Sequence, residues 1–200
     1  MKHPDRIRYA ELMSEARIRL SVVHAFLDRK VHAVYVRAST ESMCLQLRKV
    51  LELIAFSALV SQREAYIAVR TDISKDWHGK RILKAVASIN PDFYPSPTPQ
   101  FVNNVKVRGG HLTPTQFAKL YDACGALLHS TNPFRRERDF AAFERRIPCW
   151  VSRIEALLAD HHVSLAGSRE RLWVTVPLQE GKPITVRHLV PRPKPLPMPK

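Results

Sequence analysis

The longest run of apolar positions spans residues 41–60 and predicts the central helix of the fold. One face of this helix is formed by apolar residues that recur at helical spacing, namely Cys44, Leu47, Leu51, Ile54 and Ala58. Further apolar residues cover most of the remaining circumference, which is typical of a helix surrounded by other helices. Arg48 and Glu52 lie one turn apart at the border of this apolar face, so they are the first candidates for chemistry.

A second apolar pattern predicts one long helix, or two in line, over residues 5–37. Steps of four and three separate its apolar positions, which are Tyr9, Met13, Ala16, Leu20, Val23 and Leu27. Such a heptad-like seam fits a helix packed along a bundle. It also fits a short coiled coil, which predicts a homodimer through residues 9–27.

Two further patterns predict helices of the same bundle. The first runs from about Asp76 to Ile89, with its apolar side inward at Trp77, Ile82, Leu83, Val86 and Ile89. Before it, residues 61–73 either continue the central helix or turn within the sequence SQRE. The next helix begins with a capping box, Thr113-Pro114-Thr115-Gln116, and buries Phe117, Leu120, Tyr121, Cys124, Leu127 and Leu128.

The last predicted helices lie on either side of Pro148. Asn132 before Pro133 is expected to cap one of them, whose apolar positions are Phe134, Phe140, Phe143 and Ile147. Pro148 is expected to break that helix, and a short final helix follows through Val151, Ile154, Leu157 and Leu158. Earlier in the chain, residues 91–100 hold four prolines and predict irregular structure, which Phe93 and Tyr94 anchor on the bundle.

From His161 the apolar pattern changes from helical to alternating. Leu172, Val174 and Val176, followed after a glycine-containing turn by Ile184, Val186 and His188, predict a β-hairpin, to which residues 162–166 could add a strand. The fold class is therefore mainly α, a helical bundle with a small C-terminal β-hairpin appendage, α+β overall. Residues 1–161 form the bundle, 162–190 the appendage packed on it, and 191–200 a disordered proline-rich tail.

The charge of the chain favours a polyanionic partner. Net charge is +14 and the pI is about 10.2, whereas 45% apolar content is ordinary for a globular protein. RNA or an acidic protein is the expected partner, ahead of a membrane. The basic residues are scattered, so a binding face requires the fold to gather them. Candidate nucleic-acid contacts are Arg135, Arg136, Arg145, Arg146, Lys106 and Arg108.

Several classes of protein are not indicated. Three cysteines lie far apart without paired ligand spacing, and the adjacent His161 and His162 diverge, so no metal or other cofactor is expected. Phosphate-loop, dinucleotide and nucleophile-elbow patterns are missing. The first residues have no apolar signal-peptide region, and the run from Val50 to Val60 is too short to span a bilayer. A cytoplasmic protein with no membrane partner is expected.

His129 is the third candidate for chemistry, beside Arg48 and Glu52. It follows the helix that begins at the capping box and shares one side of it with Asp122 and Gly125. Gly125 leaves that flank open to another helix or a ligand. A histidine there can act as acid or base near neutral pH, or simply complement the helix dipole.

The sequence resembles the HEPN-like helical domains (higher eukaryotes and prokaryotes nucleotide-binding) and is similar to bacterial proteins of unassigned function. The shared segments are LQLRKVLELI within residues 41–60, the FYP loop at 93–95, and LTPTQFAKLYDACGALLH. The resemblance covers about residues 5–135 and implies a small helical bundle, often dimeric, in RNA cleavage, toxin–antitoxin pairs or phage defence.

Active HEPN domains carry an arginine shortly before a histidine on one helix. Here only His129 matches, because residues 122–125 hold no arginine, and Arg48 would have to act from another helix. Two hypotheses follow. The first is a non-catalytic helical module that binds RNA or a protein partner. The second is a metal-independent endoribonuclease with His129 as acid–base residue and Arg48 on the phosphate.

Overall fold

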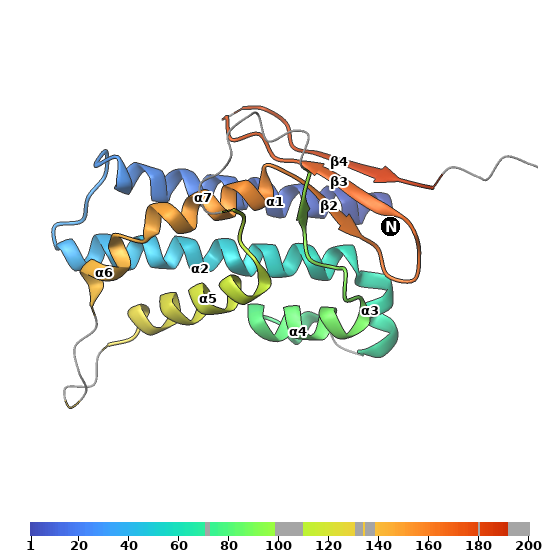
Figure 1. Ribbon diagram of the computed structural model, residues 1–200, viewed down its shortest axis with the longest axis horizontal. Helices are drawn as coiled ribbons and strands as arrows, with labels where there is room; N and C mark the ends of the chain where they lie inside the picture. Colours follow the sequence, from blue (N-terminus) through green and yellow to red (C-terminus); the bar gives the residue numbers. More distant parts are fainter. Residues whose placement is uncertain (71–72, 99–109, 131–133, 135–138, 180, 192–200) are drawn as a thin grey trace, which may run out of the picture.

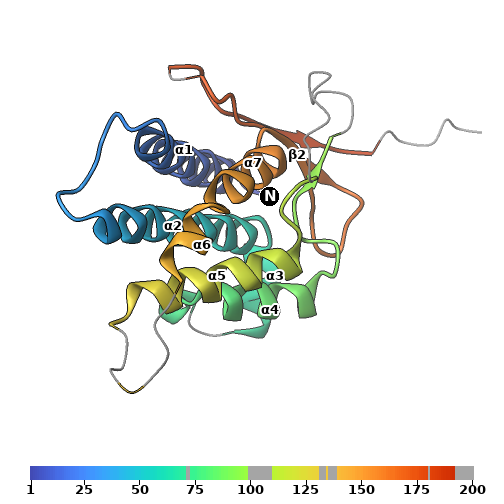
Figure 2. The same ribbon diagram turned by 60° about the vertical axis from the view of Figure 1, so that its left-hand side comes forward.

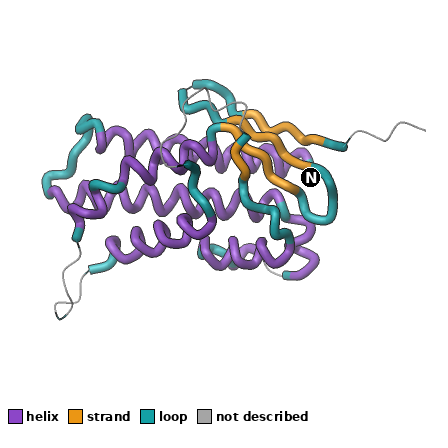
Figure 3. Tube along the Cα trace, viewed as in Figure 1, coloured by secondary structure: helices purple, strands orange, loops and turns teal. Residues whose placement is uncertain are grey.

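A computed structural model describes residues 1–70, 73–98, 110–130, 134, 139–179 and 181–191. Its helices are α1 His3–Leu27, α2 Val36–Ser61, α3 Arg63–Val69, a 3-10 helix Ile73–Lys75, α4 Gly79–Ile89, α5 Pro114–Leu128, α6 Phe140–Glu144 and α7 Ile147–Leu158. Its strands are β1 Ser96–Pro97, β2 Asp160–Ser164, β3 Arg171–Thr175 and β4 Thr185–Leu189. The chain is therefore mainly helical, with a small antiparallel sheet on one side (Figures 1 and 3).

α2 lies at the centre of the bundle, as its apolar circumference predicts. α1 packs along one side of it, and α4 and α5 cover the other (Figure 2). Leu47, Val50, Leu51 and Ile54 are fully buried in this layer. The helix begins at Val36, earlier than predicted, and Tyr35 takes the N-cap position.

The first helix is shorter than predicted, because it ends at Leu27 and the chain then turns back. Asp28 caps it, and Arg29 adopts a left-handed backbone conformation with φ of 57°. α1 and α2 therefore run antiparallel, and the prediction of helix as far as residue 37 is wrong (Figure 1). The heptad-like seam, from Tyr9 to Val23, is buried within the chain, which is the bundle packing foreseen as the first alternative.

The segment between α2 and α5 departs from prediction at Trp77. α2 ends at Ser61, and α3 follows after the single residue Gln62. α4 begins only at Gly79, so Trp77 lies before the helix and is 66% exposed instead of inward. Ile82, Leu83 and Val86 of α4 are buried, as the periodicity predicts.

The capping box at the start of α5 is confirmed, whereas the following helix was misplaced. Asn132 and Pro133 lie outside the described residues, and the N-cap of α6 is Asp139, whose carboxylate accepts from the backbone N–H of Ala142 at 2.7 Å. Phe134 is 96% exposed. Pro148 occupies the first turn of α7, where its missing N–H leaves no helical bond unmade, so it helps to start a helix instead of breaking one.

The sheet has the strand order β1-β2-β3-β4, antiparallel throughout. The hairpin of β3 and β4 is confirmed, and the third strand, β2, begins at Asp160. β1 comes from the proline-rich segment, where Ser96 pairs with His162, so that segment is not wholly irregular. Phe93 is buried there and the hydroxyl of Tyr94 donates to the carbonyl of Leu112 at 3.1 Å, which anchors the segment as predicted.

A buried amide joins the sheet to the bundle. Gln62 donates to the carbonyl of Ser164 at 2.7 Å and accepts from the backbone N–H of Ala166 at 2.8 Å. Asn90 at the end of α4 donates to the same carbonyl of Ser164 at 2.9 Å.

No helix among the described residues is long and apolar enough to cross a membrane.

Candidate functional site

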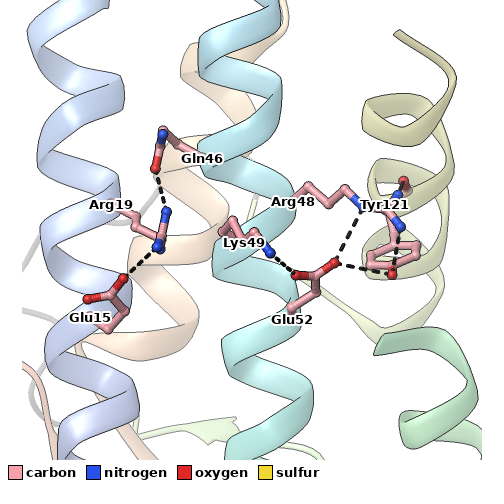
Figure 4. A network of polar contacts seen from close by, with 7 residues as sticks. All are labelled: Glu15, Arg19, Gln46, Arg48, Lys49, Glu52 and Tyr121. Carbon is pink, nitrogen blue, oxygen red and sulfur yellow. Dashed lines mark hydrogen bonds and ion pairs between the residues drawn. The ribbon is translucent and has the colours of Figure 1, made fainter. Parts of the chain in front are cut away.

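Arg48 and Glu52 form a polar cluster with Tyr121 where α2 meets α5. The Arg48 guanidinium donates from Nη2 to the Tyr121 hydroxyl at 2.9 Å and from Nη1 to the Tyr121 carbonyl at 3.4 Å. Its Nε lies 3.4 Å from Glu52 Oε1, and Lys49 Nζ lies 3.1 Å from Glu52 Oε2 (Figure 4). All three guanidinium nitrogens of Arg48 therefore have partners within the chain.

Gly125 allows the guanidinium to lie this close to α5. A Cβ at that position would stand 2.6 Å from Arg48 Nη1, so a larger residue would push the arginine away. With that space open, the guanidinium carbon of Arg48 lies over the Tyr121 ring, 4.0 Å from its centroid. Another helix does approach the flank that Gly125 leaves open, as expected.

The charges of this cluster largely compensate one another. The side chains of Arg48 and Glu52 are 22% and 13% exposed, so both are partly shielded from water. Burial raises the pKa of Tyr121, while the Arg48 charge opposes that rise, and the phenol stays neutral near pH 7. A partly buried, paired arginine over an aromatic ring is a stabilising contact between two helices.

His129 lies one turn beyond Gly125, at the end of α5. It is the exposed C-cap residue of α5, eight positions and therefore about 12 Å along the axis beyond Tyr121. The histidine ring that lies against Tyr121 is instead that of His78, at 5.2 Å between centroids, with the exposed Trp77 edge-on to it at 5.7 Å. The sequence offered no signal for His78, which precedes α4 and belongs to no apolar pattern.

A second polar group in Figure 4 belongs to the α1–α2 contact. Arg19 pairs with Glu15 at 2.6 Å and donates to Gln46 at 2.9 Å. Its members lie on the α1 side of α2, whereas Arg48 and Tyr121 lie on the α5 side. The two groups are therefore separate surface contacts of one central helix.

Arginines and aromatic rings gather where α6 and the first turns of α7 meet the start of α2. We name the following set the arginine–aromatic surface: Arg37, Phe140, Arg145, Arg146, Trp150 and Arg153. The Arg37 guanidinium stands 4.5 Å from the centroid of the Phe140 ring. Those of Arg146 and Arg153 stand 5.3 and 5.5 Å from that of Trp150.

The carboxylates near this surface already have partners. Asp139 caps α6, and Glu144 accepts from the hydroxyl of Thr40 at 3.2 Å. Arg145 and Arg146 are exposed, and Nε of Arg153 is buried with no hydrogen-bond partner among the described residues. The other predicted contacts, Arg135, Arg136, Lys106 and Arg108, lie outside the described residues.

His161 and His162 point to opposite sides of β2. His161 is fully buried, where Nδ1 donates to the carbonyl of Leu158 at 3.0 Å and Nε2 meets the Tyr9 hydroxyl at 2.9 Å. The His162 ring lies against Trp173, at 5.8 Å between centroids. Within the described part of the chain no group of three or more His, Cys, Asp and Glu could hold a metal ion.

Two groups of described residues bear on function. One is the Arg48 cluster, in which Arg48 is paired with Glu52 and Tyr121, and the other is the arginine–aromatic surface. Of the predicted contacts, Arg145 and Arg146 belong to the second, and the sequence did not single out Trp150 or Arg153. No protein-family model matches the chain, and no curated protein or solved structure matches it either.

Proposed function

We propose that this protein is a non-catalytic helical module that binds RNA through the arginine–aromatic surface. The observation that carries the proposal is the position of the Arg37 guanidinium over the Phe140 ring and of those of Arg146 and Arg153 over the Trp150 ring. A guanidinium is planar, and its fork of N–H donors suits phosphate oxygens, while a neighbouring ring restricts the rotamers of its side chain. The net charge of +14 adds long-range attraction to a polyanion.

Two helix ends add to the positive potential of this surface. α2 and α7 both begin here, and neither has a side-chain hydrogen bond at its N-cap (Figure 1). The partial positive charge of a helix N-terminus attracts phosphate groups. Asp139 and Glu144, the carboxylates closest in sequence, hydrogen-bond to the neutral donors Ala142 N–H and Thr40 hydroxyl.

The hydrogen bonds and the ion pair that Arg48 makes within the chain favour a binding function over RNA cleavage. An arginine that stabilises a reacting phosphate needs donors available to it, whereas those of Arg48 are directed to Tyr121 and Glu52. His129, in the second hypothesis the acid–base residue, lies one turn beyond Gly125, the position that Arg48 approaches. It is therefore the pairing of Arg48 that disfavours cleavage. The HEPN-like resemblance is consistent with either function and remains a proposal.

Fluorescence anisotropy with a labelled single-stranded RNA tests the proposal. Wild type should bind with a strong salt dependence. The double variant Arg145→Ala/Arg146→Ala should bind at least about fivefold more weakly, with the slope of log K against log salt reduced by about 1.4, or about 0.7 for each lost charge on a single strand. The matched control is Arg8→Ala/Arg81→Ala, which removes the same charge from exposed positions on α1 and α4. It should change affinity less than about twofold.

Three results would count against RNA binding at this surface. Absence of binding by wild type at about 0.1 M salt contradicts the function itself. Equal weakening by both double variants indicates diffuse charge without a localised surface. RNA cleavage in the presence of a chelator, lost in His129→Ala, would establish the endoribonuclease instead.

A second candidate is docking of an acidic protein partner on the loop before α2. Val31, Val34, Tyr35 and Val36 are 48%, 107%, 60% and 74% exposed, an unusual density of apolar side chains on a surface. Arg29, Lys30 and Arg37 flank them, so an apolar centre has a basic rim.

The paired test uses Val34→Asp, which should abolish binding of a co-purifying protein when the complex is rebuilt from purified components. Val69→Asp is the control, because Val69 is also exposed, at 65%, but lies on α3. Equal binding by wild type and Val34→Asp would contradict docking at the loop.

A further inference from the structure

A cavity of about 240 Å³ opens between α1, α7 and the chain that follows β3. Leu20, Leu158 and Val176 are almost fully buried and form its apolar wall, and Leu178, 57% exposed, stands at its mouth. Arg17, Ser21, His24 and Glu155 complete the lining. An apolar cavity with a few polar groups at one side is the usual form of a small-molecule site.

The charged groups of this cavity are already paired. His24 Nε2 lies 2.6 Å from Glu155 Oε1, which joins α1 to α7. Arg17 Nη1 donates to the carbonyls of Pro177 at 3.2 Å, Gln179 at 3.5 Å and Lys182 at 2.7 Å. A charged ligand would therefore lose its hydration without gaining an unpaired counter-charge, which disfavours it.

The cavity still offers hydrogen-bond acceptors to a neutral ligand. The Ser21 hydroxyl donates to the carbonyl of Ile18 at 2.7 Å, so its oxygen is left as an acceptor. The carboxylate of Glu155 also has lone pairs beyond the one that meets His24. Both groups accept, so they select a ligand that donates a hydrogen bond.

Arg17 holds one wall of the cavity in place. Its three carbonyl partners belong to the chain after β3, and the same chain carries Leu178 to the mouth. The cavity is therefore partly preformed, which lowers the entropy that a ligand must lose on binding.

We propose that this cavity binds a small uncharged aliphatic alcohol, with its alkyl chain against Leu20, Leu158 and Val176 and its hydroxyl donating to Ser21 or Glu155. An apolar cavity of about 150 Å³ accommodates benzene, so about 240 Å³ fits roughly ten non-hydrogen atoms. The cavity differs from the arginine–aromatic surface in its residues and in its preference for neutral molecules. Its ligand is independent of the proposed RNA.

Titration of the ¹⁵N-labelled full-length protein with 1-octanol tests this. The backbone amides of Leu20, Leu158 and Val176 should shift with saturation and a Kd below about 1 mM. Octanoate and octylammonium, which have the same chain and a charged head, should bind at least about tenfold more weakly. Octanol binding should be unchanged in Arg145→Ala/Arg146→Ala, which separates this site from the RNA proposal.

Ser21→Phe and Ser14→Phe form a matched pair of variants. Both positions lie on α1, seven residues apart, but only Ser21 lines the cavity. Ser21→Phe fills the mouth and should weaken octanol at least about tenfold, and Ser14→Phe should leave it unchanged. Leu178→Ala, which removes an exposed side chain at the mouth, should weaken it by about two- to fivefold.

Any of three outcomes would overturn the site. These are shifts that do not saturate at the cavity amides, octanoate or octylammonium binding as tightly as octanol, and full octanol affinity in a Ser21→Phe variant that retains the wild-type unfolding temperature. The charged probes decide the ligand class and the serine pair decides the location.

Discussion

At the scale of single residues, Gly125 determines that Arg48 and Tyr121 can meet. A β-carbon there would lie 2.6 Å from the guanidinium, although the obstructed atom is the end of a flexible side chain. Alanine is the better helix former by about 1 kcal/mol, so two effects of opposite sign compete at this position.

A double-mutant cycle separates these effects. In an Arg48→Ala background, Gly125→Ala should stabilise the protein by about 1 kcal/mol, because only helix propensity changes. With Arg48 present the gain should be smaller by at least about 0.5 kcal/mol, because the new methyl group displaces the arginine from Tyr121. Urea unfolding of the four proteins measures both values. Equal gains in the two backgrounds would show that a methyl group at position 125 does not displace Arg48.

His161 is the residue at which pH should matter most. Because Nδ1 donates to Leu158, the neutral ring accepts at Nε2 from the Tyr9 hydroxyl. Burial lowers the pKa of His161 from its ordinary value of 6.5 to about 4. The unfolded chain therefore binds the proton more readily than the folded one between these two values.

Stability should consequently fall as the pH falls from about 6.5 to about 4, and this residue alone should account for about 3 kcal/mol. Urea unfolding at pH 7, 5.5 and 4 gives the dependence. His161→Gln should be less stable at pH 7 but lose less stability on acidification. An unchanged slope in the variant would contradict the assignment.

At the scale of elements, the capping box shows that local chemistry can start a helix. Thr113 Oγ1 accepts from the backbone N–H of Gln116 at 3.3 Å, and Gln116 Oε1 accepts from that of Thr113 at 3.0 Å. Pro114 adds a backbone already suited to the first helical turn. The start of α5 therefore needs no distant contact.

Thr113→Ala should destabilise the protein by about 1 kcal/mol, because one N–H at the helix start loses its partner. Thr115→Ala is the control, since Thr115 is exposed in the same turn and makes no cap. Chemical unfolding compares the two. A cost for Thr115→Ala equal to that for Thr113→Ala would mean that the box itself is not the cause.

Pro148 shows the limit of the same local reasoning. A proline starts or stops a helix according to whether the following residues find a core to cover. After Pro148, Trp150, Val151 and Ile154 are buried, and α7 as a whole packs on β1, β2 and α1, so the helix extends forward from the proline. The apolar spacing before it, at Phe143 and Ile147, continues through both elements and could not mark the boundary.

At the scale of the whole molecule, Gln62 unites the bundle and the sheet. It lies between α2 and α3, is only 2% exposed, and bonds to Ser164 and Ala166, more than a hundred positions away in sequence. Asn90, at the end of α4, joins this network, because its side-chain amide donates to Gln62 Oε1 and to the carbonyl of Ser164. Buried polar networks of this kind fix the relative position of the parts they join.

Gln62→Leu should therefore destabilise the protein by about 3 kcal/mol, because the Ala166 N–H and the Asn90 amide lose a buried partner. Gln46→Leu is the control, since Gln46 contacts Arg19 at the helix surface, and should cost less than about 1 kcal/mol. Amide exchange should also quicken at Ala166 in the first variant alone. Slow exchange there in Gln62→Leu would mean that the sheet docks without this amide.

Local sequence encodes the features that depend on neighbours within a few turns: the buried face of α2, the start of α5, the alternation of β3 and β4, and the border position of Arg48 and Glu52. Hydrophobic periodicity and helix caps involve residues close together in the chain, so they can be identified from the sequence. Tertiary structure decided the exposure of Trp77, the strand at Ser96 and the pairing of Tyr9 with His161 across 152 positions. It also brought Tyr121 of α5 against Arg48 of α2, because packing between helices sets which groups meet and no local pattern encodes that choice.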